Sequence, residues 1–432
     1  MNFENLNLDN FGEKMYSTMT ELYPICRSIT GEGVRQTLSI IQRTIPINIS
    51  KIPTGTKVFD WEIPLEWNIK DAYVKDPGGK KIIDFKKSNL HVLGYSEPIN
   101  KKISLDELKE HIFTLPEYPN WIPYRTSYYN KNWGFCMAYN EFKELKRGNY
   151  EVVIDSELKR GELVFGEYYI KGEREEEILL STYVCHPSMC NDNLSGIVLL
   201  MSLAEILSKQ KMKYSYRFLF IPETIGAITW LSLNRNRANK IKYGLIATCV
   251  GDKGKITYKK TRKGDFEIDK IVEKVLKDSG EDYNLVDFFP YGSDERQFCS
   301  PGFNLPVGVL MRTQYYKFKE YHTSADDLNF ISKEHLLDSL KKYLEILYTI
   351  ANNKKYLNLN SKCEPQLGKR GLYDSIGGAN EFKFNHEAVS WVLNSSDGEN
   401  SLLEISIRTG IKFRDVKNAA DSLLRVNLLK EV

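Results

Sequence analysis

The chain has 432 residues, of which 42% are hydrophobic and 27% are charged, with a formal net charge of +3. This length predicts two or three domains, and so small a net charge excludes a global field that draws the protein to nucleic acid or to an anionic membrane. The seven cysteines form no CxxC pair and no regular framework. That usage is typical of free thiols in a reducing compartment, so we expect a cytoplasmic protein.

In the first third of the chain, the sequence pattern changes from helical to β-rich near residue 50. Residues 10–44 show apolar spacing typical of two helices separated by the turn "TGEG". From there to about residue 154, short β-rich runs alternate with turn sequences such as "DPGGKK" and "KRGNY". We therefore predict an inserted β-rich domain at 51–159. Neither a signal peptide nor an apolar run long enough to span a membrane is evident, so no membrane contact is expected.

The middle of the chain alternates between strands and helices. The strand "EILLSTYVC" is followed by the helix "SGIVLLMSLAEILSKQ", and the strands "YSYRFLFIP", "IKYGLIATCVG" and "PVGVLMR" follow with helical segments between them. Such alternation predicts an α/β fold with a mostly parallel sheet and helices on both faces. The first two helices of the chain are expected to pack on the same layer. The α/β domain is therefore predicted to be discontinuous, at 1–50 and 160–360.

The last sixty residues or so have a different pattern. The helices "FNHEAVSWVLNSSDG" and "SLLEISIRTG", a glycine turn and the helix "KFRDVKNAADSLLRVNLLKEV" with a short β tail predict a winged helix-turn-helix at 370–432. Its third helix presents only a thin basic face, so binding to nucleic acid is not expected. A homodimer contact or a protein partner is favoured instead. The basic residues are Lys412, Arg414, Lys417 and Arg425, and acidic ones are Asp415 and Asp421.

Polar residues follow four successive strands of the predicted sheet. His186 and Asp192 follow the first strand, Glu223 follows the second, Asp252 follows the third, and His322 comes after the strand "PVGVLMR". Ligands of open parallel sheets lie beyond the carboxyl ends of the strands. Two imidazoles and two or three carboxylates suit Zn²⁺ or a similar metal, which also relieves their mutual repulsion. The sequence therefore predicts a metal site at this edge.

Each of these residues also has a simpler explanation. Asp192 precedes "NLSG" and fits a helix N-cap, Glu223 fits a loop acid, Asp252 lies in the turn sequence "VGDKGK", and His322 fits a loop histidine. Their joint occurrence at successive strand ends favours the metal site over four separate explanations.

Two aromatic segments are candidates for binding substrate. "WIPYRTSYYNKNWGFC" contains Arg125 and Tyr128 and either lines the site or forms the core of the inserted domain. Tyr321 precedes His322 directly in the chain and is expected to wall the site.

The segments "HPSMCNDNLSG", "FIPETIG", "VGD", "YGSDERQF" and "EYHTSADDL" resemble successive motifs of the co-catalytic zinc aminopeptidases. That superfamily includes bacterial leucyl aminopeptidase and the glutaminyl cyclases. With its inserted β domain and winged helix, the whole chain is similar to a bacterial aminopeptidase-like group within it. The resemblance implies a zinc-dependent hydrolase that cleaves an N-terminal peptide bond or a related amide bond in a small substrate.

The resemblance also implies a role for each matching residue, with one or two Zn²⁺ ions per chain. The catalytic base that accepts a proton from the attacking water would be Glu223. The metal ligands would be Asp192 between two sites, His186 and Asp252 at one of them, and His322 at the other. Asp294 of "YGSDERQF" would lie near the substrate or near the ligand histidine.

The chain departs from the family pattern at Thr224. The pattern has a base followed by an acidic ligand, whereas this sequence has Glu223 followed by Thr224, and a hydroxyl is a poor ligand for zinc. Either a single metal binds tightly, or Glu223 is a ligand and the base is lost. Two other functions remain open: a different metal-dependent amide or acyl enzyme, for example on sugar-linked precursors, and a catalytically degenerate regulator that binds a ligand and acts through its winged helix.

Overall fold

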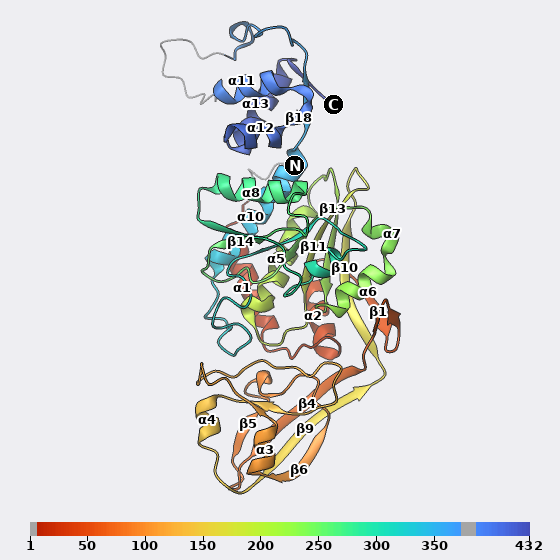
Figure 1. Cartoon of the computed structure of the whole chain (residues 1–432), viewed down its shortest axis with the longest axis vertical. Helices are drawn as coiled ribbons and strands as arrows, with labels where there is room; N and C mark the ends of the chain where they lie inside the picture. The colour runs from red at the N-terminus through yellow and green to blue at the C-terminus, as the bar shows by residue number, and fades with distance from the viewer. Residues whose placement is uncertain (1–6, 373–385) are drawn as a thin grey trace. The chain divides into compact units, whose positions relative to one another are not determined.

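A computed structural model describes residues 7–372 and 386–432 (Figure 1). The chain divides into two compact units, each of which is described by itself. The larger unit comprises Leu6–Phe266 and Tyr283–Lys341, and the smaller includes Glu267–Asp282 and Lys342–Val432.

The larger unit is built on an eight-stranded sheet. In chain order its strands are β1 (Asn48–Pro53), β10 (Glu162–Ile170), β11 (Glu177–Tyr183), β12 (Ser215–Ile221), β13 (Ile241–Ala247), β14 (Ile256–Lys259), β15 (Tyr283–Val286) and β16 (Val307–Met311). In space the order is β1-β10-β12-β11-β13-β16-β14-β15. The central strands β12, β11, β13 and β16 run parallel, and every residue of β11, β12 and β16 is buried, as parallel interior strands require. The predicted α/β class is confirmed.

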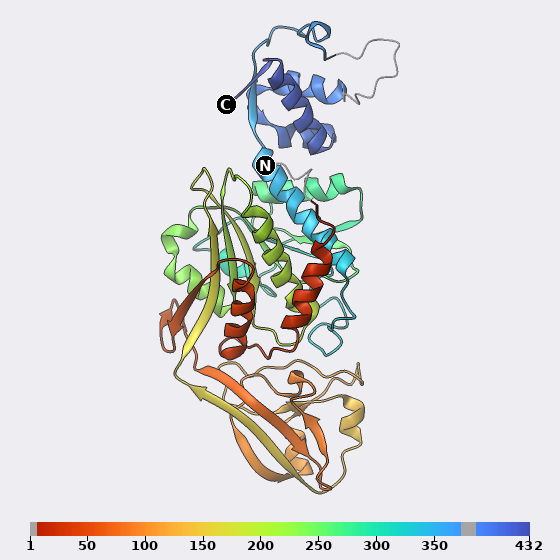
Figure 2. The ribbon, with the colours of Figure 1, turned by 180° about the vertical axis from the view of Figure 1, so that it is seen from behind.

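Helices cover both faces of this sheet. The helices of the larger unit are α1 (Phe11–Leu22), α2 (Glu32–Gln42), α5 (Ser195–Leu207), α6 (Ile225–Leu233), α7 (Arg235–Ala238), α9 (Glu295–Phe298) and the start of α10 (Lys333–Asn352). α5 packs on β11, β12 and β13, α1 packs on α5, and α2 packs on β10 (Figure 2). α6 and α9 contribute to the core cluster that includes Trp230 and Phe298.

The buried helix α5 leads out of the segment that carries Asp192. Cys190–Leu207 is apolar enough to cross a membrane by length and composition, yet 94% of it is buried inside the protein, as expected for a core helix. A Cβ added at Gly196 would lie 2.4 Å from the carbonyl oxygen of Ala247 and 2.5 Å from Oγ1 of Thr182. Glycine therefore allows the first turn of α5 to approach β13 closely, which fixes the segment before it.

The inserted domain has its own sheet, in the order β5-β4-β9-β6. Its strands and helices are β2 (Lys57–Val58), β3 (Trp61–Glu62), β4 (Glu66–Lys75), β5 (Lys81–Asp84), η1 (Asn89–His91), β6 (Ile99–Ser104), α3 (Leu105–Glu110), β7 (Ile112–Phe113), β8 (Phe135–Cys136), α4 (Tyr139–Lys143) and β9 (Asn149–Lys159). A separate apolar cluster, which includes Val74, Phe135 and Ile154, forms its core. The domain leaves and rejoins the main sheet at one place, because Pro53 of β1 pairs with Glu162 of β10.

The smaller unit contains the winged helix. Its elements are α8 (Glu267–Ser279), the later part of α10, β17 (Lys355–Asn358), η3 (Gly368–Arg370), α11 (His386–Ser395), β18 (Asp397–Ser401), α12 (Leu402–Thr409), α13 (Phe413–Arg425) and β19 (Leu429–Glu431). The strands form a sheet in the order β18-β17-β19. Gly410 ends α12 with a left-handed φ of 76°, as a C-terminal cap requires. The predicted winged helix is confirmed.

Two details of this unit differ from the sequence-based expectation. Strand β17 precedes residue 370, and it lies between the other two strands of the wing. The first helix was expected at residues 384–398, but α11 ends at Ser395 and Gly398 belongs to β18. Residues 384 and 385 lie outside the described part of the chain.

The third helix of the winged helix is docked within the smaller unit. The backbone N–H of Phe413 donates to Oδ2 of Asp278 at 2.9 Å. The guanidinium of Arg414 donates to both carboxylate oxygens of Glu345, at 3.0 and 2.6 Å. Helix α13 therefore has its first turn fixed against α8 and α10.

Candidate metal centre

Side chains that follow three parallel strands of the sheet meet at one point. His186 follows β11, Glu223 follows β12, and His322 lies in the loop after β16. Asp192 lies in η2 (Cys190–Leu194), directly before α5. His186, Asp192 and His322 each direct one potential ligand atom to a common point, with these atoms all within 4.8 Å of one another. The structure therefore brings together three of the four metal ligands predicted from the sequence.

Asp192 and His322 place two buried polar atoms opposite each other at this point. Oδ2 of Asp192 lies 2.9 Å from Nε2 of His322, and neither atom has another hydrogen-bond partner among the described residues. Burial by itself would raise the pKa of Asp192, but the neighbouring imidazoles and the hydroxyl of Tyr183 outweigh it and lower the pKa. A buried carboxylate oxygen and a buried imidazole nitrogen that face each other in this way are what a shared cation would satisfy.

The second oxygen of Asp192 is already engaged. The hydroxyl of Tyr183, at the end of β11, donates to Oδ1 of Asp192 and lies 2.6 Å from Oγ1 of Thr248. A carboxylate that bridges two metals with one oxygen on each needs both of its oxygens as ligands. The contact with Tyr183 therefore disfavours that mode of bridging and favours one metal ion at Asp192.

Asp326 holds the backbone that carries Asp192. Its carboxylate accepts hydrogen bonds from the backbone N–H groups of Asn191 and Asp192 at 2.6 and 2.9 Å. Its carbonyl oxygen accepts a third from the N–H of Cys190 at 2.9 Å. Asp326 belongs to the same loop as His322, so these bonds connect the loops of two predicted ligands.

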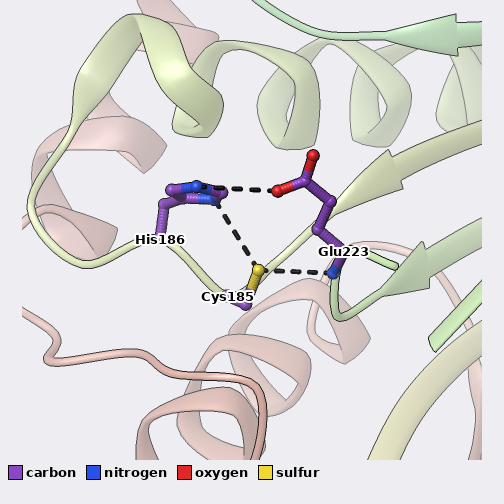
Figure 3. A group of neighbouring side chains, drawn as sticks. All are labelled: Cys185, His186 and Glu223. Carbon is purple, nitrogen blue, oxygen red and sulfur yellow. Dashed lines mark hydrogen bonds and ion pairs between the residues drawn. The ribbon is translucent and has the colours of Figure 1, made fainter. Parts of the chain in front are cut away.

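His186 is held in a form suited to metal binding. Burial lowers its pKa to about 4, so the imidazole is neutral at pH 7, as a ligand must be. Figure 3 shows its ring facing both Cys185 and Glu223: Sγ of Cys185 lies 3.6 Å from Nδ1, and Oε2 of Glu223 lies 3.7 Å from Nε2. The same sulfur accepts a hydrogen bond from the backbone N–H of Glu223 at 3.3 Å. Cys185, His186 and Glu223 thus form a second group of potential ligands that shares His186 with the first.

Glu223 combines a buried setting with access to solvent. Burial raises its pKa well above the usual range, and the negative charges of Asp294 and Asp192 add to that effect. Its side chain nevertheless keeps 23% of its surface exposed. A carboxylate with a raised pKa that reaches solvent beside a candidate metal site is suited to accept a proton.

Thr224 occupies the position at which the family pattern has an acidic ligand. Its hydroxyl accepts a hydrogen bond from the guanidinium of Arg296 at 2.9 Å, and its backbone N–H donates to Asp294 at 2.7 Å. A positive charge therefore lies beside Thr224, which disfavours a second cation there. Asp294, which was expected near the substrate or a ligand histidine, is buried, and burial raises its pKa to about 7.

Asp252 is not brought into the group of ligand atoms. It is buried, and its carboxylate accepts hydrogen bonds from Nδ2 of Asn191 at 2.8 Å and from the hydroxyl of Thr313 at 2.6 Å. These bonds connect three loops at the end of the sheet. Asp252 therefore stabilises the loop of Asp192 through its hydrogen bond with Asn191.

The aromatic candidates occupy different places. Tyr321 stacks on the ring of His322, with centroids 3.9 Å apart and an angle of 11° between planes. The hydroxyl of Tyr128 lies 3.0 Å from that of Tyr124, whose ring contacts His186 and His322. Arg125 is exposed, so the structure does not bring its side chain into the buried group.

The donor set fits a single divalent ion. It offers two imidazoles and one carboxylate oxygen, with Glu223 beside them. Such a mixture of nitrogen and oxygen donors suits zinc or a similar borderline metal, and three protein ligands with one open position are typical of catalytic sites.

Sequence inspection missed three residues that shape this centre. Tyr183 reads as one more residue of a buried strand. Tyr124 lies within a segment that was singled out for its neighbours Arg125 and Tyr128. Asp326 belongs to the quoted motif "EYHTSADDL", and its position four residues after His322 was the one available signal.

Comparisons with known proteins agree with this architecture. A family profile described as a domain of unknown function (DUF4910) matches residues 16–353, and a winged helix-turn-helix profile matches residues 354–431. A Clostridium acetobutylicum protein, provisionally named a polysaccharide biosynthesis protein with an aminopeptidase-like domain, is 60% identical over 426 residues, which cover 99% of this chain and 98% of that protein.

Solved structures show the same fold. A crystal structure of a provisionally named peptidase from Clostridium acetobutylicum has a TM-score of 0.94 at 58% identity, covering 98% of each chain. BSAP, a zinc aminopeptidase from Bacillus subtilis, has a TM-score of 0.58 at 13% identity, covering 80% of this chain and 96% of that one. The resemblance to zinc aminopeptidases is thus confirmed at the level of the fold. This chain belongs to the DUF4910 family, and in it a zinc-aminopeptidase fold is followed by a winged helix.

Proposed function

We propose that this protein is a zinc-dependent hydrolase that cleaves an N-terminal peptide bond or a related amide bond. The observation that carries the proposal is the meeting of His186, Asp192 and His322, whose ligand atoms lie within 4.8 Å of one another. Oδ2 of Asp192 and Nε2 of His322 lie 2.9 Å apart and have no other hydrogen-bond partner among the described residues. Glu223 lies beside them with access to solvent.

The residues divide the work of hydrolysis between them. His186, Asp192 and His322 would hold the ion, which when bound supplies Lewis-acid polarisation of the amide carbonyl and eases deprotonation of water. Glu223 accepts the proton of the attacking water and passes it to the departing amine nitrogen. Tyr183 and Asp326 hold Asp192 in place from its side chain and its backbone.

We propose one catalytic ion per chain. Tyr183 occupies one oxygen of Asp192, Arg296 occupies the hydroxyl of Thr224, and Asp252 is bonded to Asn191 and Thr313. A second ion near Glu223 would have to displace these contacts. Under this proposal Glu223 stays free to act as the base.

Metal analysis combined with a panel of aminoacyl amides tests the proposal. Wild-type protein should carry about one zinc per chain and should hydrolyse at least one amide. Glu223→Gln should keep the metal and lose turnover by roughly 10²–10⁴-fold, the usual contribution of a general base. Loss of the metal from Glu223→Gln would instead make Glu223 a ligand. Metal-loaded protein that hydrolyses no amide would reject the proposed activity.

Amides attached to sugars form a second candidate substrate class. The ring of Tyr316 keeps 58% of its surface exposed and packs edge-on against Tyr321, at 4.8 Å between centroids. Tyr321 in turn stacks on His322. Exposed aromatic surface beside a reactive site offers a platform for a ring in the substrate, and the named Clostridium relative is associated with polysaccharide biosynthesis. Faster turnover of N-acyl amino sugars than of aminoacyl amides would select this class.

We further propose a cytoplasmic location and a protein contact through the winged helix. All seven cysteines are free, which suits a reducing compartment. Arg414 and the N-terminus of α13 are already bonded to Glu345 and Asp278, so the end of the helix that would enter a DNA groove is occupied. Measuring the mass of the protein in solution tests for a homodimer. Salt-dependent binding to random DNA would contradict the proposal that the winged helix contacts protein.

A further inference from the structure

A strip of the inserted domain is paired with the loop that carries His322. The strip is Ile122–Tyr124, and Pro123 forms an isolated antiparallel bridge with Thr323. The backbone N–H of Tyr124 donates to the carbonyl of His322 at 2.8 Å, and the N–H of Ser324 donates to the carbonyl of Ile122 at 2.8 Å. The hydroxyl of Ser324 also accepts from the N–H of Ile122 at 3.0 Å. Three hydrogen bonds thus join the strip to His322 and Ser324.

The side chain of Tyr124 touches both histidines. Its ring centroid lies 5.4 Å from that of His186 and 5.0 Å from that of His322, the second contact being edge-on. On its other side Tyr124 forms a small apolar cluster with Leu90 of the inserted domain and Met189. Met189 lies between His186 and Asp192 in sequence. The ring of Tyr124 therefore contacts His186, His322 and Met189.

The strip is anchored in the inserted domain and not in the main sheet. The backbone N–H of Gly94 donates to the carbonyl of Arg125, and the N–H of Ser127 donates to the carbonyl of Gly94, each at 2.9 Å. The loop that it contacts is long and irregular, running from the end of β16 to the start of α10. His322 itself has a φ of +54°, a left-handed conformation that is unfavourable for a non-glycine residue and persists only where neighbours enforce it.

We propose that the inserted β domain is a positioning element of the metal centre. The strip fixes the backbone of His322, and the ring of Tyr124 fixes the distance between the two imidazoles. This inference rests on the proposed function for its site, but it concerns binding of the metal and not turnover. The inserted domain then controls the affinity of the centre without supplying a ligand.

Zinc affinity, measured by competition with a chelator, tests this inference. Tyr124→Ala should weaken binding by about 10–100-fold, the range usual for groups that orient metal ligands. Tyr124→Phe keeps the ring and should bind zinc as the wild type does. Ser324→Ala removes one hydrogen bond to the strip and should shift affinity in the same direction by less, and it serves if Tyr124→Ala does not fold. The matched control is Ile154→Ala, in the core of the same domain, which should lower the thermal stability and leave the affinity unchanged.

The outcomes separate this inference from the proposed function. Wild-type affinity in both Tyr124→Ala and Ser324→Ala would overturn it, as would an equal loss in Ile154→Ala, which would attribute the effect to general destabilisation. A chain that binds zinc and hydrolyses no amide would overturn only the proposed function. Amide hydrogen exchange of the loop around His322, faster in Tyr124→Ala than in Tyr124→Phe, would support the positioning role without any metal present.

Discussion

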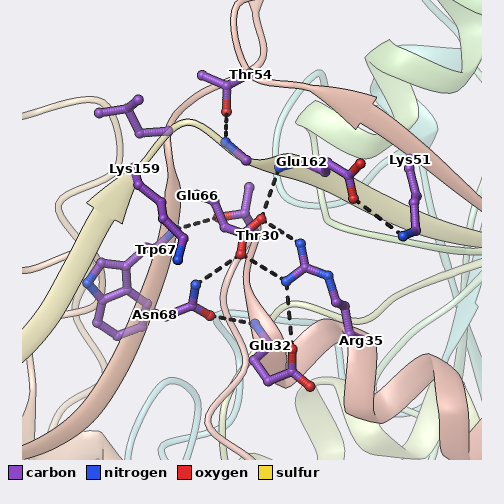
Figure 4. A network of polar contacts seen from close by, with 12 residues as sticks. Thr30, Glu32, Arg35, Lys51, Thr54, Glu66, Trp67, Asn68, Lys159 and Glu162 are labelled. Atoms are coloured by element: carbon purple, nitrogen blue, oxygen red, sulfur yellow. Dashed lines mark hydrogen bonds and ion pairs between the residues drawn. The ribbon is translucent and has the colours of Figure 1, made fainter.

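Glu66 joins the inserted domain to the main sheet, and its carboxylate offers a quantitative test of the structure (Figure 4). It is buried at the start of β4 and accepts hydrogen bonds from the guanidinium of Arg35, from Nδ2 of Asn68 at 2.9 Å, and from the backbone N–H of Glu162 at 2.9 Å. In Glu66→Gln the side-chain amide has about the same shape, but it places an NH₂ group where one of these donors now points.

The size of the effect follows from the pKa of Glu66. Burial alone would raise this pKa, but the hydrogen bonds from Arg35, Asn68 and Glu162 lower it from 4.5 to about 2. That separation corresponds to about 3 kcal/mol, and because Arg35 is partly exposed, solvent screening reduces the expected contribution to about 1–2 kcal/mol. A depressed carboxyl pKa stabilises the fold above the unfolded value, so this contribution is present above pH 4.5 and lost as the pH falls toward 2.

Urea unfolding followed by tryptophan fluorescence measures this contribution. At pH 7 the free energy of unfolding of Glu66→Gln should lie about 1–2 kcal/mol below that of the wild type. The difference should shrink steadily between pH 4.5 and pH 2, because the wild-type carboxylate becomes protonated. A difference that stays constant across this range would show that Glu66 acts through packing and not through its charge. No difference at pH 7 would refute the network itself.

Four further outcomes are expected. His186→Ala should abolish stoichiometric metal binding, as measured by elemental analysis of purified protein. Tyr183→Phe removes the hydroxyl that holds Asp192 and should weaken zinc binding by about 10-fold or more in a chelator competition. Asp326→Asn, which replaces an acceptor of two N–H groups by a partial donor, should weaken it similarly while the far-ultraviolet circular dichroism stays unchanged. Arg414→Ala should lower the stability of the winged helix by about 0.5–1 kcal/mol, as measured by calorimetry. The zinc affinity of this variant should equal that of the wild type.

The architecture could be predicted from the sequence because its strands and helices have distinct hydrophobic patterns. The buried runs of β11, β12 and β16 read as parallel strands, and Gly410 marks the turn of the winged helix. Strand β17 was not recognised, because four residues of mixed polarity carry no strand signal until β18 and β19 pair with them. Its pairing depends on contacts with residues about 40 and 70 positions later, which local pattern analysis does not reach.

The sequence predicts site residues that directly follow a strand. It does not predict those whose place depends on the pairing of distant loops. His186, Asp192 and His322 were expected to meet, and they do. Asp252 follows a strand in the same way, yet its carboxylate turns to Asn191 and Thr313, a choice that depends on side-chain packing. The contact of Tyr124 with His322 joins segments about 200 residues apart, and no local sequence pattern predicts it.

The paired ends of the inserted domain have a consequence for how such a protein is modified. Pro53 and Glu162 lie opposite each other in adjacent antiparallel strands, and the N–H of Thr54 donates to the carbonyl of Gly161 at 2.9 Å. A short turn grafted between them would close the chain as a hairpin and leave the remaining hydrogen-bond ladder whole. The inserted domain is thus separable by topology, although the ring of Tyr124, which contacts both histidines, would be lost with it. If this domain positions the metal centre as we propose, a trimmed chain would keep its main sheet and bind zinc less tightly.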